Sequence, residues 1–245
     1  RSISGASVGR QPCGGWKRSA VGPGAKAGGY HYLQVLGTWR RAEVTAPTPA
    51  DRPCGLVEQC VDHIAGLGTR VELSSLLDAV ARDAHEWDEW FGRSTDIGGL
   101  ERERNILRYR PAPTQVRGCA DAKLVDVARV VAAGLVAAGD DISVCLDPSF
   151  GEGLGRALRS VGVAVTTASD EDWYASLGAG RVRLVGGNPS RAADEADSDP
   201  QLALWANEVT SAPQVELLPF LREQSVSMTA HRFGNPDAAV LSVRL

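Results

Sequence analysis

Between residues 104 and 185 the sequence alternates short apolar runs with helix-like segments, and this alternation restricts the possible fold more than any other feature. The apolar runs predict strands at Asn105–Tyr109, Ile142–Leu146, Val163–Thr167 and Arg181–Val185. The segments between them predict helices at Lys123–Ala138, Gly153–Val161 and Asp170–Leu177. Strands joined by helices in this order form a parallel sheet, because parallel neighbours need a long crossover connection. We therefore predict an α/β fold with a Rossmann-like parallel sheet of at least four strands and helical crossovers.

The chain before residue 104 is organised differently. Residues 46–53 contain three prolines, which interrupt both helix and sheet and therefore predict a linker. Two helices are expected after this linker, at about 56–66 and 74–91, because apolar residues recur there at intervals of three and four.

The first 33 residues combine a strand pattern of small residues, at positions 3–8, with a loop rich in glycine. The glycines of this loop are Gly14, Gly15, Gly22, Gly24, Gly28 and Gly29. Glycine loses more backbone freedom on folding than any other residue. A loop with this many glycines is therefore expected to need positive φ angles or a close approach of its backbone to another group.

Several stretches carry a resemblance to a known family. They are RQPCGGWKRSA at 10–20 with KAGG at 26–29, ERNILRYRP at 103–111, LPFLREQSVS at 218–227 and HRFGNP at 231–236. These stretches resemble aldehyde dehydrogenases of the branch that oxidises L-glutamate γ-semialdehyde (Δ1-pyrroline-5-carboxylate dehydrogenases). Their order resembles the C-terminal part of bifunctional proline-utilization (PutA-like) proteins, and the resemblance covers nearly the whole chain.

The resemblance implies three regions. Residues 1–45 would be the C-terminal end of an aldehyde dehydrogenase catalytic domain, 46–103 a linker and helical segment, and 104–245 a Rossmann-like C-terminal domain. It also implies a parent protein that oxidises L-glutamate γ-semialdehyde to L-glutamate in proline catabolism. Its cofactor would be NAD, held outside this chain, and FAD would be present only if a proline dehydrogenase domain precedes.

The resemblance places the substrate-binding residues in the glycine loop. In the resembled enzymes, backbone amides and a serine hydroxyl of residues 17–29 hold the α-carboxylate and amino end of the substrate, and the motif matches that serine to Ser19, followed by Ala20. Small residues let successive amides approach an anion. Lys17 and Arg18 would steer the anion, although a plain surface turn with a solvated charge pair is the alternative interpretation.

The sequence departs from the family pattern at two places in this region. Cys13 stands where the family has phenylalanine, and a packing contact is expected to be lost there. Tyr30-His31 stands where the family has proline followed by asparagine or histidine.

The resemblance assigns no catalytic and no cofactor-binding residue to this chain. In the family, the nucleophilic cysteine, the base and the dinucleotide contacts all precede the glycine loop, so the chain alone is expected to be inactive. Cys13 is a poor candidate nucleophile, because no base lies near it in sequence. Residues 151–155 have the spacing G-x-G-x-G rather than G-x-G-x-x-G, and Glu152 would repel a pyrophosphate.

Two other groups of polar residues have simple structural interpretations. Cys54, Cys60 and His63 lack a fourth ligand nearby in sequence, so no metal site is expected. The carboxylates of residues 170–172 are typical of a helix N-terminus, where the macrodipole favours negative charge, and paired-acid catalysis there is the lesser alternative.

Composition restricts the possible partners and compartment. The net charge of −4 without a basic stripe disfavours nucleic-acid binding. No apolar run reaches the ~20 residues that span a bilayer, and no secretory leader is visible. Five cysteines without a regular framework indicate free thiols, and hence a cytoplasmic location. The opening strand would expose an unpaired edge, which predicts a homo-oligomer.

Two hypotheses of function follow. In the first, the chain is the C-terminal piece of an NAD-dependent oxidoreductase whose small-molecule aldehyde substrate is bound through the parent enzyme. In the second, it is a non-catalytic structural or interaction module derived from the aldehyde dehydrogenase fold.

Overall fold

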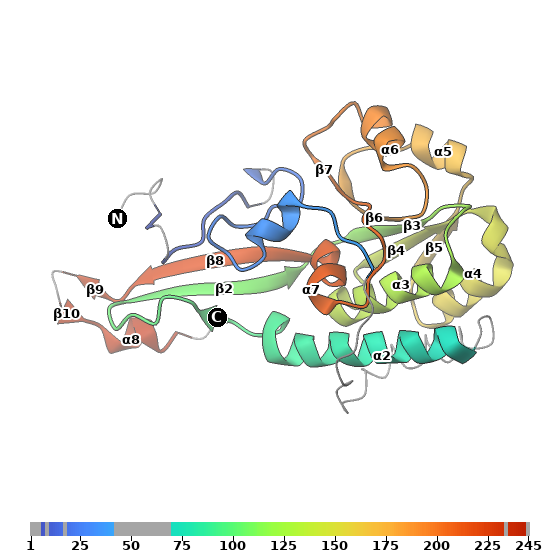
Figure 1. Ribbon diagram of the computed structural model, residues 1–245. Coiled ribbons are helices and arrows are strands. Elements are labelled where there is room, and N and C mark those ends of the chain that lie inside the picture. The colour runs from blue at the N-terminus through green and yellow to red at the C-terminus, as the bar shows by residue number, and fades with distance from the viewer. Residues whose placement is uncertain (1–5, 8–9, 17–18, 42–69, 233–234, 244–245) are drawn as a thin grey trace.

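The computed structural model describes residues 6–7, 10–16, 19–41, 70–232 and 235–243. These residues form an α/β body from which a long two-stranded arm extends (Figure 1). The strand expected at 3–8 lies mostly outside the described residues, and the helix expected at 56–66 lies entirely outside them.

A parallel sheet of five strands forms the centre of the body. Its strands are β3 (Thr114–Gly118), β4 (Ile142–Leu146), β5 (Ala164–Thr167), β6 (Gly180–Val185) and β7 (Leu202–Trp205). They lie in the order β5-β4-β3-β6-β7, and all four pairings are parallel. The predicted α/β class with a parallel sheet and helical crossovers is thereby confirmed.

The crossovers are helices on the two faces of the sheet. They are α3 (Leu124–Ala138), α4 (Gly151–Ser160, after the short 3₁₀ turn η4, Pro148–Phe150), α5 (Asp170–Ala175) and α6 (Pro189–Glu195). From β3 the chain moves outward through β4 to β5, and then returns to place β6 on the other side of β3. The strand order therefore reverses between β3 and β6, at the centre of the sheet.

The membership of the sheet differs from the prediction at one strand. The segment predicted at Asn105–Tyr109 is a strand, β2 (Glu103–Pro111), but it pairs antiparallel with β8 (Leu221–Thr229) and lies outside the parallel sheet. The strand β3, which takes its place, was missed because Val116 is its only large apolar residue. The strand β7 was also missed, although all four of its residues are apolar.

The arm is built mainly from β2 and β8, which pair along their whole length from Glu103↔Thr229 to Pro111↔Leu221. The short strand β1 (Thr95–Asp96) pairs with the other edge of β2. Beyond β8, β9 (His231–Arg232) pairs with β10 (Asn235–Pro236), and α8 (Ala238–Leu241) follows. Part of the N-terminal segment lies along the arm (Figure 1), where the backbone amide of Lys26 donates to Glu223 on β8 at 2.6 Å.

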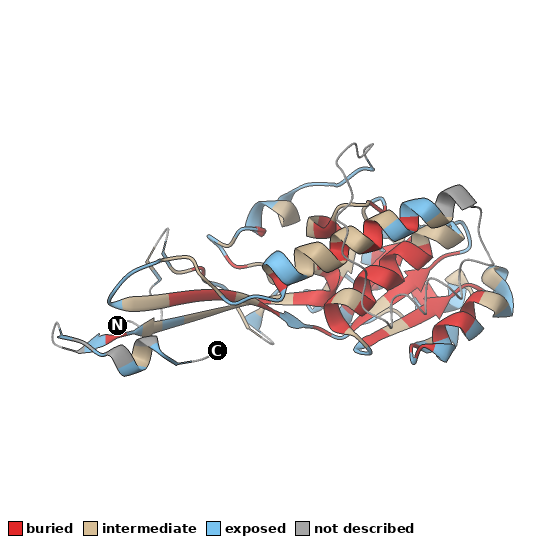
Figure 2. Cartoon of the chain, turned by 90° about the horizontal axis from the view of Figure 1, so that it is seen from below, coloured by how far each residue is buried: buried red, intermediate tan, exposed pale blue. Residues whose placement is uncertain are grey.

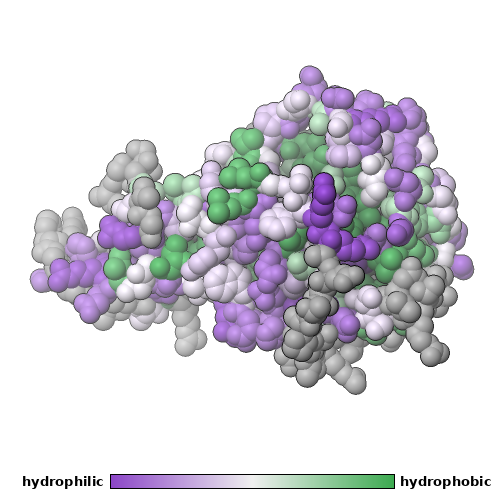
Figure 3. Space-filling model, viewed as in Figure 1, coloured by the Kyte–Doolittle hydropathy of each residue, from purple (hydrophilic) through white to green (hydrophobic). Residues whose placement is uncertain are grey.

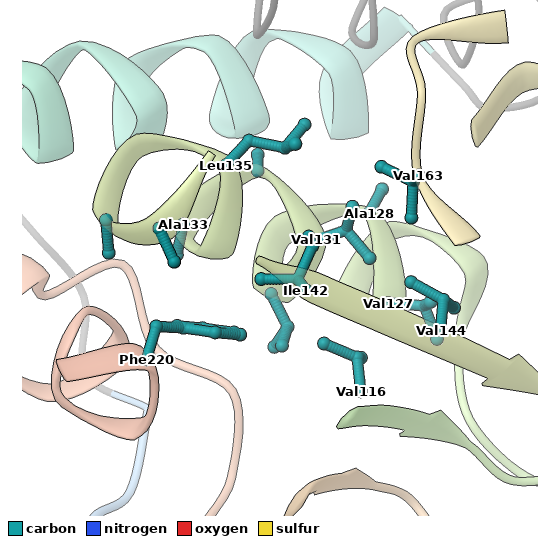
Figure 4. Packing of buried hydrophobic residues seen from close by; sticks show 14 of the residues in the cluster. Val116, Val127, Ala128, Val131, Ala133, Leu135, Ile142, Val144, Val163 and Phe220 are labelled. Carbon is teal, nitrogen blue, oxygen red and sulfur yellow. The ribbon is translucent and has the colours of Figure 1, made fainter. Parts of the chain in front are cut away.

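The main hydrophobic core surrounds α3. This helix lies between the sheet and α2 (Arg70–Glu86), and its side chains are buried on nearly all sides, as Figure 2 shows for the body as a whole. Helix α2 continues as a single π turn, η3 (Trp87–Phe91), so the helix expected at 74–91 is confirmed as one continuous helical segment. Phe220, from the turn η5 (Leu218–Phe220), points toward α3 beside Ile142 (Figure 4).

Two buried ion pairs join elements of the body. Arg129 on α3 donates two hydrogen bonds to the carboxylate of Asp83 on α2, at 2.5 and 2.9 Å. Arg183 on β6 donates two to Glu216 on α7 (Pro213–Glu216), both at 3.1 Å, and both side chains are fully buried. Each pair joins two elements of the body. Separating the two elements would be costly, because it would leave a buried charge uncompensated. Among the described residues, none of the helices combines the length and apolar character that crossing a membrane requires.

Candidate functional site

The glycine-rich segment closes on itself as a compact loop. Cys13 and Ala27 form an antiparallel bridge through two backbone hydrogen bonds of 3.1 and 2.8 Å. We call residues 13–27 the anchor loop. The ammonium of Lys26 reaches back inside it and donates to the carbonyls of Gly14 (3.2 Å) and Gly15. Burial lowers the pKa of Lys26, and the nearby Glu223 carboxylate partly offsets that effect.

The two predicted substrate-binding residues lie in an exposed turn of this loop. The Ser19 hydroxyl donates to the carbonyl of Trp16 (2.8 Å) and accepts from the Trp16 amide (2.9 Å). A Cβ atom at Gly15 would lie 1.8 Å from the Ser19 carbonyl oxygen, so only glycine fits there. The close backbone approach that the glycine content predicted is therefore present.

A cavity of about 480 Å³ lies between the anchor loop and β8. The loop contributes Cys13, Gly14, Trp16 and Lys26 to its lining, and neither Ser19 nor Ala20 takes part. The assignment of these two residues to substrate stays a prediction. Lys17 and Arg18 lie outside the described residues.

Cys13, the departure from the family's phenylalanine, is exposed. A smaller side chain at an exposed position leaves no void in a core. The packing contact that was expected to be lost at Cys13 therefore does not lie in a core of the described residues. His31, the second departure, is buried.

His31 belongs to a buried cluster that sequence reasoning missed. Its Nδ1 atom lies 2.5 Å from the hydroxyl of Tyr109, which in turn lies 3.4 Å from Oε1 of Glu223. The other carboxylate oxygen of Glu223 accepts from the backbone amide of Lys26 at 2.6 Å. The His31 ring also stacks on Phe91, with ring centroids 5.1 Å apart. We call His31, Tyr109 and Glu223 the buried triad; it ties the segment after the anchor loop to both strands of the arm.

The carboxyl edge of the parallel sheet is a second candidate ligand site, because doubly wound sheets bind dinucleotides where their strand order reverses. Here the chain's own carboxylates occupy that edge. Asp121 accepts from the Gly187 amide (2.7 Å), and Asp170 accepts from the guanidinium of Arg117 (2.5 Å). Asp147 lies 3.9 Å from the same guanidinium. This edge does not fit a pyrophosphate, because three carboxylates would face it and its buried cation is already paired.

The glycine motif at 151–155 offers no phosphate site either. Gly151 begins α4 with a φ of +63°, and Glu152 is exposed and lies 3.7 Å from Arg159. The acidic residues 170–172 begin α5 as expected: Ser169 caps that helix by accepting from the Asp172 amide (3.1 Å). Asp170 pairs with Arg117, and Glu171 pairs with Arg191 at 2.7 Å, which lowers the pKa of Glu171.

The described cysteines differ in accessibility. Cys13 is exposed, whereas Cys119 and Cys145 are buried. Burial raises the pKa of the Cys119 thiol to about 12, so the thiolate is scarce at neutral pH. Cys54, Cys60 and His63 lie outside the described residues, and the described residues contain no cluster of side chains able to hold a metal ion.

This difference predicts the order of thiol reactivity. In the native chain at pH 8, iodoacetamide should alkylate Cys13 within minutes, while Cys119 and Cys145 should react only after unfolding in denaturant. Peptide mass mapping of the alkylated chain distinguishes the three sites. Modification of Cys119 at the rate of Cys13 in the folded chain would contradict the burial described here.

Comparisons with known proteins show which proteins this chain is similar to. No protein-family model matches the chain, and no curated protein matches it. Among solved structures, a Proline Utilization A (PutA) protein from Corynebacterium freiburgense is 29% identical, with a TM-score of 0.64 over 96% of this chain and 20% of its own length. A bifunctional PutA protein is 19% identical over 61% of this chain and 19% of its own, with a TM-score of 0.42. An NAD-dependent benzaldehyde dehydrogenase from Corynebacterium glutamicum is 12% identical over 60% of this chain and 37% of its own, with a TM-score of 0.36.

The first of these likenesses covers the anchor loop, the arm and the parallel sheet together, because it extends over nearly the whole chain. This chain spans one fifth of the length of that protein. Its motifs, its fold and this likeness agree, and they show a chain that is similar to a PutA protein from end to end, as its sequence predicts.

Proposed function

We propose that this chain is the C-terminal part of a PutA-like oxidoreductase that oxidises L-glutamate γ-semialdehyde to L-glutamate, with NAD as the hydride acceptor, in proline catabolism in the cytoplasm. The observation that carries the proposal is the likeness to the Corynebacterium freiburgense protein, which extends over 96% of this chain. Because this chain corresponds to 20% of that protein, the reaction is proposed for the whole protein and not for this chain alone. FAD enters the proposal only with a preceding proline dehydrogenase domain.

The exposed surface of residues 21–39 supports the proposal that this chain is part of a larger protein. Most of the large apolar side chains that the described residues expose lie within residues 21–39. They are Val21, Tyr30, Tyr32, Leu33, Leu36 and Trp39. Figure 3 shows hydrophobic side chains gathered over this region, around the 3₁₀ turn η2 (Tyr32–Leu36). Patches of this kind mark interaction surfaces, so we assign the 21–39 segment to contact with the rest of a catalytic domain.

The anchor loop would bind the anionic end of the aldehyde substrate. Its backbone approaches itself closely at Gly15, where a Cβ atom would meet the Ser19 carbonyl oxygen. Backbone amides held in such turns bind anions. The nicotinamide cofactor would be held by other parts of the protein, because the carboxylates at the edge of the parallel sheet oppose a pyrophosphate.

A chimera tests the proposal. The matching segment of the Corynebacterium freiburgense PutA protein is replaced by residues 1–245 of this chain, and NADH formation from L-glutamate γ-semialdehyde and NAD⁺ is followed by absorbance. We expect NADH formation by the chimera and none by the 245-residue chain alone. Turnover by the chain alone, or a folded chimera without activity, would contradict the proposal. The second of these results would favour a non-catalytic interaction module.

The role of Ser19 can be tested in the same chimera. Ser19→Ala should raise KM for the semialdehyde about tenfold with little change in kcat, since a hydrogen bond to a charged group is worth roughly 1.5–3 kcal/mol. Ser176→Ala is the matched control, because its hydroxyl also donates to a carbonyl three residues earlier, that of Trp173 at 2.9 Å. An unchanged KM in Ser19→Ala, or an equal rise in both variants, would exclude this role.

A further inference from the structure

A second cavity, of about 320 Å³, lies where the segment after the anchor loop faces the body. We call it the interface cavity. Residues from 23–39 line one side, and residues from the end of β7, α7, η5 and the beginning of β8 line the other. Figure 1 shows where β7, α7 and β8 lie. Most of the lining is apolar, and its large apolar residues include Val35, Trp39, Leu204, Trp205, Leu218 and Leu221. Cavities of this size and character accommodate small molecules.

One polar group of the interface cavity lacks a partner among the described residues. The side-chain oxygen of Gln34 is buried and accepts no hydrogen bond from them. His31 is buried and also lines the cavity, where its Nδ1 atom contacts the hydroxyl of Tyr109. A buried acceptor without a donor costs about 1–3 kcal/mol, so such groups are expected to have a partner when the protein is at work.

The chemistry of Gln34 determines which kind of partner the interface cavity takes. The side-chain oxygen of an amide can only accept a hydrogen bond. Gln34 Oε1, which accepts none from the described residues, therefore requires a donor.

The apolar lining determines the remainder of the ligand. Trp39 and Trp205 contribute aromatic surface, which favours aromatic rings in offset or edge-to-face contact. The guanidinium of Arg181 lies 4.6 Å from the centre of the Trp205 ring and is pointed at backbone carbonyls, including that of Leu221 at 2.8 Å. Because this cation lies behind the lining, a neutral ligand suits the cavity better than an organic cation.

We propose that the interface cavity is a binding site for a small neutral aromatic molecule that carries an N–H or O–H donor, of the indole or phenol class. The ring lies between the apolar walls, and the donor binds Gln34 Oε1. Neither Ser19 nor Ala20 lines this site, and the proposal does not depend on the oxidoreductase function.

Indole and 1-methylindole distinguish this site from a merely apolar one, because they share a ring system and differ in the donor. Titration calorimetry with the 245-residue chain should give one site for indole with a Kd of about 1 mM or tighter. 1-Methylindole should bind about five- to tenfold more weakly, since it lacks the hydrogen bond. Absence of indole binding, or equal affinity for the two compounds, would overturn the proposal.

Three variants locate the site. Gln34→Met should remove most of the preference for indole, and Leu204→Trp, which fills the cavity, should abolish binding of both compounds. Gln224→Met is the matched control, because its side-chain oxygen lies outside the interface cavity and already accepts from Arg108 at 2.7 Å. Circular dichroism verifies that each variant is folded. Retention of the full preference in Gln34→Met, or of binding in a folded Leu204→Trp, would place the site elsewhere and refute the proposal.

Discussion

Arg183→Met should lower the free energy of unfolding by about 3–5 kcal/mol, since it leaves a buried carboxylate without its counter-ion. Arg183 and Glu216 are both fully buried, and the guanidinium also donates to the carbonyls of Leu184 (2.8 Å) and Asn207 (3.0 Å). A domain is typically stable by only about 5–15 kcal/mol, so this loss would leave the chain close to unfolding at room temperature. Urea denaturation followed by circular dichroism measures the effect.

Two further variants show whether the buried charge is the cause. In the double variant Arg183→Met, Glu216→Gln, much of the stability should return, because the amide oxygen still accepts from the Thr210 amide, now 2.8 Å from Glu216 Oε1. Arg156→Met on the exposed surface of α4 should change the stability by less than about 0.5 kcal/mol. If Arg183→Met were no more destabilising than Arg156→Met, the pair would not join β6 to α7 as described.

Phe220→Ala should cost about 3–5 kcal/mol of stability, through lost apolar burial and the cavity left behind. The ring is fully buried and fills the space between η5 and α3. It lies so close to the helix that a Cβ atom at Gly134 would be 2.8 Å from the ring edge. Tyr32→Ala, at an exposed aromatic residue, is the control and should cost little in the isolated chain.

The contact with Gly134 makes this prediction more specific. Gly134→Ala should destabilise the chain by about 1–3 kcal/mol through overpacking, although alanine favours helix more than glycine does. In a Phe220→Leu background the same substitution should cost less or become stabilising, because the ring is gone. Additive effects in this double-mutant cycle would mean that Phe220 does not pack on α3 at Gly134.

The parallel sheet was predictable from sequence where its strands are rich in apolar or β-branched residues. The strand β4 was predicted at its observed bounds, and β5 and β6 within one residue, because β4 and β6 each carry at least three apolar side chains and β5 ends in Val-Thr-Thr. The same signal is too weak in β3. Val116 is its only large apolar residue, and only the folded chain shows that Asp170 pairs with the guanidinium of Arg117.

The buried triad could not be predicted in the same way. His31, Tyr109 and Glu223 are separated by 78 and 114 residues along the chain, and no local pattern links them. The antiparallel pairing of Tyr109 with Glu223 brings two of them together, and the segment after the anchor loop adds the third. In that segment the sequence showed only that Tyr30-His31 departs from the family pattern. By contrast, the tight turn at Gly15 was predictable, because glycine is the residue that allows the backbone to approach another group closely.

Residues 21–39 are proposed to be a surface that a larger catalytic body covers. Amide hydrogen–deuterium exchange tests this directly, by comparing these residues in the isolated 245-residue chain and in the chimera with the Corynebacterium freiburgense PutA protein. The amides of 21–39 should exchange at least about tenfold more slowly in the chimera, while those of α3 should exchange at similar rates in both. Equal exchange of 21–39 in the two proteins would contradict the proposed contact.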